Sequence, residues 1–247
     1  MLKEERLDHI LQTLQRADRI TYEGMAAELK VSEDTIRRDI ELLHKNGLLA
    51  RVRGGAMLRS HHPLAFQDRT GYLAEGKNVI ALKAQSLIRQ NQTVFLDGGT
   101  TLCAVAAHFP ADIQFRAVTN NQALVPILAQ FKKIELVILG GYYNRVSETS
   151  VGAQTCREAA MYVADLYLMG TCAIDHTFGI TASDHEDGAV KQAMLGASLK
   201  KVVLSNQEKI GITEHFKICD ISDIDTLVTD LPSDDTVLDA FRDLEVL

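Results

Sequence analysis

The stretch "VSEDTIRRDIELLHKNGLLARVRGGA", Val31 to Ala56, decides how the first part of the chain folds. Ser32 is a favourable helix N-cap, and Ile36 and Ile40 recur at the spacing of one helical face. The "KNG" that follows supplies a cation and a glycine, which both favour the end of a helix. The segment therefore predicts a capped amphipathic helix that stops at this glycine.

The polar face of this helix carries two adjacent arginines. With 3.6 residues per turn, Arg37 and Arg38 project away from the buried stripe near the helix N-terminus, and Thr35 lies on a flank. Arginines in this position either pair with acidic neighbours on a solvated face, as Arg37 could with Glu41, or contact a polyanion. The helix alone leaves both alternatives open.

The flanking residues complete a recognisable unit. Before this helix, one helix is expected over about residues 3–15, and Thr21 is a plausible N-cap for a second, shorter one. After it, Gly54 and Gly55 permit a tight hairpin whose strands carry basic side chains. Three helices and a hairpin form a winged helix-turn-helix, which inserts its third helix into the major groove. The residues expected to contact DNA are Ser32, Thr35, Arg37, Arg38, Lys45, Arg51 and Arg53.

This stretch resembles the DNA-binding signature of the DeoR family of bacterial transcription regulators. That signature runs V-S-x-x-T-I-R-R-D-L, continues through a G-x-L turn, and ends in a wing that closes with G-G-A. The resemblance is dense over the whole quoted segment and implies sequence-specific DNA binding. We expect Glu33, Asp34 and Asp39 to weaken non-specific attraction to DNA phosphates. Discrimination between DNA sequences then depends on a few specific contacts.

Composition and charge limit the other possibilities. The chain has 247 residues, a net charge of −7 and 46% hydrophobic residues, which is typical of one or two globular domains. Residues 1–60 carry 11 Lys and Arg against 10 Asp and Glu, whereas the remainder carries 15 against 23. Because the acidic remainder repels nucleic acid, DNA binding is expected only in the first part.

The four cysteines are scattered, and the N-terminus has no apolar signal region. We therefore expect a cytoplasmic protein with free thiols, no membrane segment, no cofactor and no metal site. The pair His61-His62 is expected to face solvent, because two adjacent histidines without further ligands rarely bind a metal. The expected division is a DNA-binding domain over residues 1–58, a linker over 59–76 and a second domain over 77–247.

The second domain alternates apolar strands with helical patterns. Segments such as "TVFLD", "FRAVTN", "ELVILGG", "DLYLMG", "KVVLS" and "DTLVTD" are the expected strands. Short apolar strands separated by helices predict an α/β domain with a mostly parallel sheet covered by helices on both faces. In such sheets, ligands bind beyond the carboxyl ends of the strands.

Polar and glycine-rich segments gather at those strand ends. In "LDGGTT", the glycines allow an anion to approach the backbone, the threonines offer donors at a helix N-terminus, and Asp97 can accept from a sugar hydroxyl. Together with later segments this composition suits a small polyol that carries a phosphate. The candidate ligand-binding residues are Asp97, Gly98, Gly99, Thr100, Thr101, Thr119, Asn120, Gly140, Gly141, Asp184, Glu186, Lys191 and Lys209.

Each of these features also has an ordinary structural interpretation. A Gly-Gly pair after a strand is usually a turn, and Lys191 and Lys209 are by default solvated cations. The acidic run at Asp184 to Asp187 is more typical of an exposed loop than of a metal site, whose ligands need fixed spacing.

The resemblance to the DeoR family extends over nearly the whole chain. Its C-terminal domain carries D-x-G-T-T, V-T-N, L-G-G, an acidic segment ending in K-x-x-M, and D-x-x-K-F-G. Their counterparts here are Asp97 to Thr101, Val118 to Asn120, Leu139 to Gly141, Asp184 to Met194 and Asn206 to Gly211. The resemblance implies a sugar-phosphate sensor domain similar in fold to sugar-phosphate isomerases and deaminases. Asn206 and Ile210 depart from the family pattern, so the role of Lys209 is the least secure of those it implies.

These observations favour a DNA-binding transcription regulator without enzymatic activity, a repressor of a carbohydrate operon modulated by a phosphorylated sugar. It would act as a homo-oligomer, a dimer or higher, so that two copies of the third helix meet two half-sites. The alternative is a sugar-phosphate isomerase or deaminase in which Asp97, Asp184 and Glu186 act as bases. A complete DNA-binding module has no role in metabolic turnover, which favours the regulator.

Overall fold

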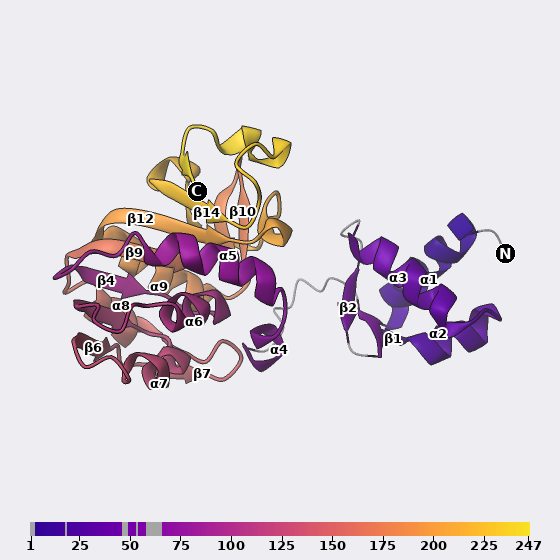
Figure 1. The fold of residues 1–247 in the computed structure, drawn as a ribbon, viewed down its shortest axis with the longest axis horizontal. Helices are drawn as coiled ribbons and strands as arrows, with labels where there is room; N and C mark the ends of the chain where they lie inside the picture. The colour runs from indigo at the N-terminus through magenta and orange to yellow at the C-terminus, as the bar shows by residue number, and fades with distance from the viewer. Residues whose placement is uncertain (1–2, 18, 46–48, 53, 58–65) are drawn as a thin grey trace. The chain divides into compact units, whose positions relative to one another are not determined.

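The computed structural model describes residues 3–17, 19–45, 49–52, 54–57 and 66–247. The chain divides into two units, Met1–His62 and Pro63–Leu247 (Figure 1). The second unit begins within the stretch expected as a linker, where helices α4 (Phe66–Thr70) and α5 (Ala74–Gln85) both start before residue 77.

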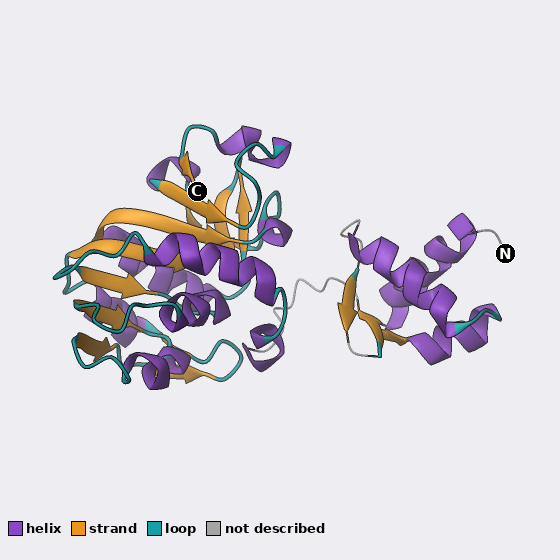
Figure 2. Cartoon of the chain, in the orientation of Figure 1, coloured by secondary structure: helices purple, strands orange, loops and turns teal. Residues whose placement is uncertain are grey.

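The first unit is a winged helix-turn-helix, as expected from its sequence (Figure 2). Its elements are α1 (Lys3–Ala17), β1 (Arg19–Thr21), α2 (Tyr22–Leu29), α3 (Glu33–Lys45), β2 (Ala50–Val52) and β3 (Gly55–Met57). The three strands form an antiparallel sheet in the order β1-β3-β2. Strand β1 was not predicted, because three residues are too few to show a strand period.

Side-chain caps start the second and third helices where the sequence predicts. The Thr21 hydroxyl accepts a hydrogen bond from the Gly24 amide at 3.0 Å. The Ser32 hydroxyl accepts one from the Thr35 amide at 3.3 Å. Between the two helices Lys30 adopts a left-handed conformation with φ of 53°, which ends α2 and turns the chain into α3. Each cap satisfies an amide that the helix itself leaves unpaired.

The wing depends on a glycine at its closest approach to β1. A Cβ on Gly55 would lie 1.9 Å from the Ile20 carbonyl oxygen, so no other residue fits there without moving the backbone. Behind the sheet, the helices bury a single apolar cluster that includes Ile10, Leu14, Ile36, Ile40 and Leu49.

Asp39, which was expected to weaken phosphate attraction together with Glu33 and Asp34, is buried and does not share the exposed face of those two residues. Its side chain is only 3% exposed and forms an ion pair with the guanidinium of Arg6 on α1. Asp39 lies three residues after Ile36 and one before Ile40, and therefore belongs to the buried stripe. The carboxylate is tolerated there because Arg6 satisfies both of its oxygens.

We predict that Arg6→Ala destabilises the first unit by about 3 kcal/mol, since it leaves a buried carboxylate without its counter-ion. Urea unfolding followed by circular dichroism measures the change. Arg116→Ala, which breaks the exposed Arg116–Glu135 pair, is the matched control and should have little effect. Equal unfolding midpoints for the two variants would contradict the prediction.

The second unit is organised by a seven-stranded parallel sheet, which confirms the predicted fold class (Figures 1 and 2). Its strands are β4 (Thr93–Leu96), β5 (Phe115–Thr119), β6 (Ile134–Ile138), β9 (Ala164–Gly170), β12 (Ser198–Ser205), β14 (Thr226–Thr229) and β15 (Glu245–Val246). They lie in the order β15-β14-β12-β9-β4-β5-β6, and every neighbouring pair is parallel.

Alternate residues of the central strands enter two separate hydrophobic clusters. Leu166 and Leu168 of β9 join the cluster that includes residues of α5 and α6, whereas Tyr167 and Met169 join the cluster on the opposite face. The sheet is therefore buried on both sides, which is why its strands appear as continuous apolar runs in the sequence. The helices of this unit are α6 (Thr100–Ala107), α7 (Val125–Leu128), α8 (Ala153–Ala159) and α9 (His185–Gly196), with 3-10 helices η1 (Gln122–Leu124), η2 (Gln207–Lys209), η3 (Ile221–Asp223) and η4 (Thr236–Phe241).

Two smaller sheets were not predicted. Strands β7 (Tyr142–Asn144) and β8 (Thr149–Val151) form a hairpin. Strands β10 (Ala173–Asp175), β11 (Gly179–Ala182) and β13 (Phe216–Cys219) form an antiparallel sheet in that order. Each of these strands has only three or four residues, and the patterns of their side chains are too short to distinguish from loops.

Candidate functional site

The outward face of α3 presents the two arginines expected to contact DNA. Arg37 and Arg38 are both exposed, whereas Ile36 and Ile40 on the opposite side are fully buried. Thr35 is partly buried and its hydroxyl lies 2.9 Å from that of Ser32, so both belong to the helix start.

The pair between Arg37 and Glu41, one of the two alternatives left open by the sequence, is absent among the described residues. Arg37 instead pairs with Glu33, one turn earlier, at 3.5 Å. Glu41 pairs with Arg51 of β2, which ties the wing to the recognition helix. The side chain of Lys45 and the whole of Arg53 lie outside the described residues.

In the second unit, Asp97 follows β4 and is completely buried at the carboxyl end of the sheet. Its Oδ1 accepts a hydrogen bond from the Gly98 amide at 2.7 Å, and its Oδ2 accepts one from the Gly170 amide at 3.0 Å. Burial raises the pKa of Asp97, while the nearby charge of Lys191 opposes that rise. A Cβ on Gly170 would lie 2.6 Å from the Gly98 carbonyl oxygen, so this position requires glycine.

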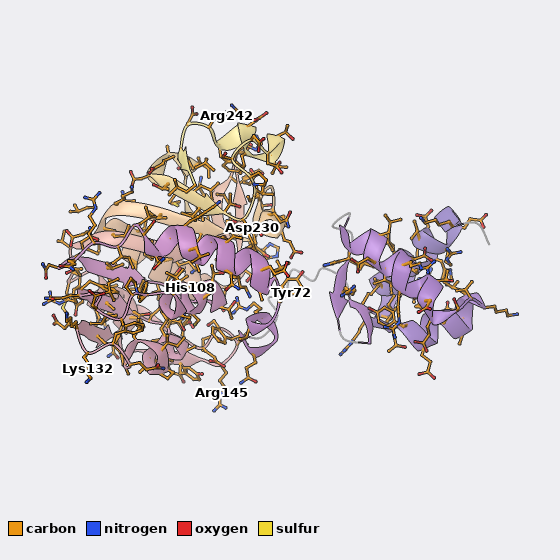
Figure 3. All side chains as sticks on the ribbon, viewed as in Figure 1. Tyr72, His108, Lys132, Arg145, Asp230 and Arg242 are labelled. Carbon is orange, nitrogen blue, oxygen red and sulfur yellow. The ribbon has the colours of Figure 1, made fainter. Side chains whose placement is uncertain are left out.

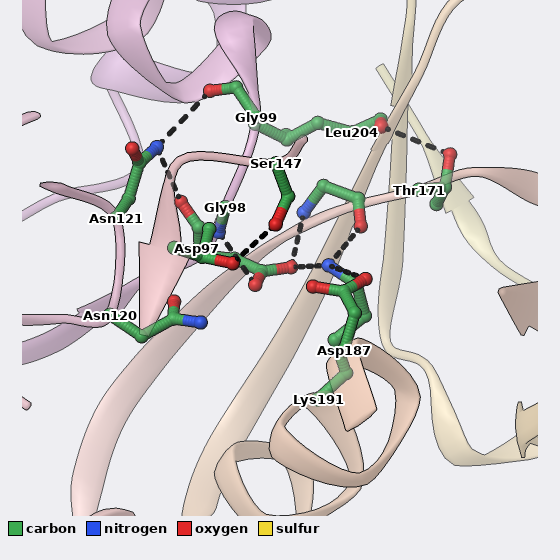
Figure 4. Close-up of polar contacts among 12 residues, drawn as sticks. Asp97, Gly98, Gly99, Asn120, Asn121, Ser147, Thr171, Asp187, Lys191 and Leu204 are labelled. Atoms are coloured by element: carbon green, nitrogen blue, oxygen red, sulfur yellow. Dashed lines mark hydrogen bonds and ion pairs between the residues drawn. The ribbon is translucent and has the colours of Figure 1, made fainter. Parts of the chain in front are cut away.

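Lys191 of α9 reaches into the same place (Figure 4). Its ammonium group forms an ion pair with Asp97, lies 3.6 Å from Asp187, and donates to the Gly170 carbonyl at 3.1 Å. Burial alone would lower the pKa of Lys191, but the two carboxylates together raise it. The lysine is only 3% exposed. It is therefore an internal cation rather than a solvated one.

The end of β5 adds three polar residues around the loop that follows Asp97. The Thr119 hydroxyl donates to the Leu96 carbonyl at 2.5 Å, and the Asn121 amide donates to the Asp97 and Gly99 carbonyls at 3.2 and 3.3 Å. The buried Asn120 amide donates to the Ser150 carbonyl at 3.0 Å, and its Oδ1 has no hydrogen-bond partner among the described residues. Figure 4 shows Asn120 beside the loop that follows Asp97.

The start of α6 completes this loop. Gly99 precedes the helix with φ of 110°, a conformation that favours glycine, and Thr100 and Thr101 form the first turn with 8% of each side chain exposed. The structure thus brings together most of the predicted ligand-binding residues. These are Asp97, Gly98, Gly99, Thr100, Thr101, Thr119, Asn120 and Lys191.

A second group of cations lies beside the start of α6. Lys77 of α5 and Thr100 of α6 both line a pocket of about 240 Å³, with walls from α4, α5 and α6. Lys77 is 6% exposed and donates to the Arg69 carbonyl, and Lys209 donates to the Thr171 carbonyl at 2.6 Å. The buried Nε of Arg69 has no hydrogen-bond partner among the residues that the structure describes.

The pKa values of both lysines reflect this arrangement. Burial, reinforced by the charge of Lys209, lowers the pKa of Lys77 to about 8. Burial likewise lowers the pKa of Lys209 to about 8. Among the described residues, neither lysine forms an ion pair with a carboxylate as Lys191 does. Lys77 and Arg69 were missed from the sequence, because a lysine and an arginine near helix ends are ordinarily solvent-exposed.

The remaining predicted residues have structural contacts. Asp184 caps α9 by accepting from the Asp187 amide at 2.9 Å, and Glu186 is exposed on the first turn. Gly140 donates to the Glu158 carboxylate at 2.7 Å, and a Cβ on Gly141 would lie 2.1 Å from the Thr155 hydroxyl oxygen. The two glycines allow the chain to pass close to α8.

Within the described ranges, no group of three or more His, Cys, Asp or Glu side chains could hold a metal ion, and His61 and His62 fall outside those ranges. All four cysteines are free thiols. None of the helices that the structure describes is long and apolar enough to span a membrane.

Comparison with known proteins covers both units. The profile of the DeoR-like helix-turn-helix domain matches residues 6–62, and that of the DeoR C terminal sensor domain matches residues 73–231. The chain belongs to the DeoR family of transcriptional regulators. This membership decides in favour of the DNA-binding regulator over the isomerase or deaminase.

Relatives in the DeoR family are similar over nearly their full lengths. The HTH-type transcriptional repressor GlcR of Bacillus subtilis is 34% identical over 232 residues, which cover 93% of this chain and 89% of that protein. The lactose phosphotransferase system repressor of Lactococcus lactis is 32% identical over 236 residues, or 93% of this chain and 92% of that protein. The glycerol-3-phosphate regulon repressor of Haemophilus influenzae is 28% identical over 234 residues, or 94% of this chain and 91% of that protein.

Among solved structures, ribose 5-phosphate isomerase A from Neisseria gonorrhoeae aligns with a TM-score of 0.39 and 17% identity. The alignment covers 54% of this chain and 52% of the isomerase. A likeness at this level carries no argument about the activity of the DeoR-family chain.

We predict that Lys191→Met lowers the free energy of unfolding of the second unit by about 3 kcal/mol at pH 8, because it leaves Asp97 buried beside Asp187 without a cation. The folded-state pKa of Asp97 then lies further above its unfolded value, so protonation stabilises the folded variant. The difference in free energy of unfolding between the unmodified chain and the variant should therefore shrink as the pH falls from 8 towards 5. Urea unfolding at several pH values tests this, with the exposed Lys200→Met as control. A deficit that is constant or grows on acidification would contradict it.

Proposed function

We propose that this DeoR-family protein is a cytoplasmic repressor of carbohydrate-utilisation genes, released from its operator by a phosphorylated sugar. Its similarity to GlcR, to the lactose phosphotransferase system repressor and to the glycerol-3-phosphate regulon repressor supports this function. In the first unit, α3 would enter the major groove with Arg37 and Arg38, and Arg51 of the wing would reach the backbone.

The observation that carries the proposal for the effector is the uncompensated positive charge beside α6. Among the described residues, Lys77 and Lys209 donate hydrogen bonds to carbonyl oxygens and form no ion pair within 4 Å, and the Nε of Arg69 has no hydrogen-bond partner. Buried cations in this state are costly unless an anion joins them. A phosphate group would supply up to two negative charges and several acceptors, and the first turn of α6 adds backbone donors.

The polar groups around Asp97 suit the rest of such a ligand. Among the described residues the buried Asn120 Oδ1 has no donor, so it can accept a hydrogen bond from a ligand hydroxyl. Sugar hydroxyls provide donors at fixed spacing from a phosphate. We therefore propose that the hydroxyls lie towards Asn120 and Asp97, and the phosphate towards Lys77 and Lys209.

Release from DNA requires the effector to bind one arrangement of the chain more tightly than another. Phe66 and Thr70 of α4 line the pocket, and α4 is the first helix of the second unit. A ligand there would contact the first helix that the structure describes in the second unit. We further propose a homo-oligomer, in which a two-fold pair of α3 helices would meet half-sites roughly 34 Å apart or a multiple of this.

The proposed phosphate site predicts that effector affinity falls as the pH rises from 7 to 9. Lys77 and Lys209, with pKa values of about 8, are mostly charged at pH 7 and mostly neutral at pH 9. A phosphate monoester has its second pKa near 6, so its own charge hardly changes over this interval. Each lost charge-assisted hydrogen bond should weaken binding by about tenfold. Calorimetry with the best ligand from a thermal-shift screen of phosphorylated sugars measures this, and a pH-independent affinity would contradict it.

Replacing either lysine should separate effector response from DNA binding. We expect Lys77→Met and Lys209→Met to bind DNA as the unmodified chain does, but to need at least tenfold more phosphorylated sugar for release. Lys132→Met is the matched control, because Lys132 is exposed before β6, far in sequence from the pocket residues (Figure 3). Fluorescence anisotropy with labelled DNA gives both affinities. If both variants are released from DNA by the same concentration of phosphorylated sugar that releases the unmodified chain, the phosphate binds elsewhere.

A further inference from the structure

The adjacent arginines of α3 have different surroundings. The Arg37 guanidinium lies 4.7 Å from the centre of the Tyr22 ring and 3.5 Å from the Glu33 carboxylate. Arg38 is exposed, and none of the residues that the structure describes forms a hydrogen bond or ion pair with its side chain. One arginine is therefore held in place and the other is free to move.

The two side chains also leave the helix in different directions. Successive residues are about 100° apart around an α-helix, so Arg38 lies roughly opposite the midpoint of the buried Ile36 and Ile40. Arg37 lies about 80° from that midpoint, on a flank. Its contact with Tyr22, the first residue of α2, shows that this flank faces the start of the preceding helix.

We infer that the two arginines divide the work of DNA binding, Arg38 reading a guanine in the major groove and Arg37 holding a backbone phosphate. In a helix-turn-helix, the outermost ridge of the recognition helix faces the base edges, whereas the preceding helix crosses the backbone. A guanidinium that lies on the first residue of α2 is thus placed beside the backbone. This inference goes beyond effector control and rests on the proposed docking of α3.

The chemistry of each position agrees with this assignment. Reading guanine through O6 and N7 needs a guanidinium that can align both of its donors with the base, and Arg38 has no competing partner. Arg37 would have to leave both Glu33 and the Tyr22 ring to reach a base. It can instead offer its remaining donors to a phosphate while keeping the ring contact.

Conservative replacements by lysine distinguish the two roles. A lysine can replace arginine at a phosphate but cannot form the paired contact with guanine. The probe is the duplex that the full-length chain enriches from a random-sequence library, compared with a shuffled duplex of the same composition. Arg38→Lys should lose about tenfold to a hundredfold in affinity for the enriched duplex and little for the shuffled one. Arg37→Lys should retain both affinities, and Arg37→Ala should weaken both by a similar factor.

A base analogue tests the contact itself. Replacing each guanine of the enriched duplex in turn by 7-deazaguanine removes the N7 acceptor. At one guanine, this replacement should lower the DNA affinity of the unmodified chain and of Arg37→Ala. The same replacement should leave the DNA affinity of Arg38→Ala unchanged. Thermal unfolding of every variant confirms that the first unit remains folded, which is expected because both side chains are exposed.

The outcomes separate this inference from the proposed docking. If neither alanine variant changes affinity for either duplex, α3 does not dock through these arginines and both ideas fail. Two other outcomes would overturn the division of roles while leaving the docking of α3 intact. One is that Arg37→Lys no longer prefers the enriched duplex. The other is that every 7-deazaguanine replacement that lowers the affinity of the unmodified chain also lowers that of Arg38→Ala.

Discussion

The ion pair between Asp97 and Lys191 is the contact on which the second unit's site depends. Its two residues are 94 positions apart, one after β4 and the other in the middle of α9, and both are almost completely buried. Neither charge is tolerable there alone. The Gly170 backbone bonds to both side chains, so the pair fastens the ends of two neighbouring strands to a helix. The loop from Gly98 to Thr101 takes its position from this arrangement.

The cations of this unit fall into two groups, Lys191 with carboxylate partners and Lys77 and Lys209 with carbonyl partners. Lys191 has two carboxylates within reach and a raised pKa, whereas burial lowers the pKa of Lys77 and Lys209, which have carbonyl partners. A balanced group stabilises the fold and has little further affinity for an anion. A group of buried cations without counter-ions destabilises the empty protein. Binding of an anion removes this destabilisation, and the free energy recovered adds to the affinity for the anion. The first group stabilises the fold, and the second is the group that we propose binds the effector phosphate.

The sequence predicted those parts of the molecule that follow from local periodicity. The caps at Thr21 and Ser32, the buried stripe of α3 and the parallel sheet all leave a repeating pattern, and the residues at the ends of β4 and β5 follow from the sheet. Contacts between distant segments leave no such pattern. The burial of Asp39 could not be predicted because its partner Arg6 lies 33 positions earlier, and Lys77 was missed because the pocket walls come from three helices. Asp184 and the glycines after β6 lay in a polar strand-end pattern, yet their observed contacts are a helix cap and a close approach to α8.

Exposure, more than the number of charges, distinguishes which anion each unit can bind. The exposed arginines of α3 and β2 can meet the rigid, wide surface of a duplex. Lys77 is 6% exposed inside an acidic unit, so a duplex is both repelled by the surface and too large to reach it. Under the proposed function, a small phosphate ester would pass both barriers, because a pocket of about 240 Å³ has room for it and Lys77 would attract it at short range. One chain would then bind two phosphate-bearing partners without either competing for the other's site.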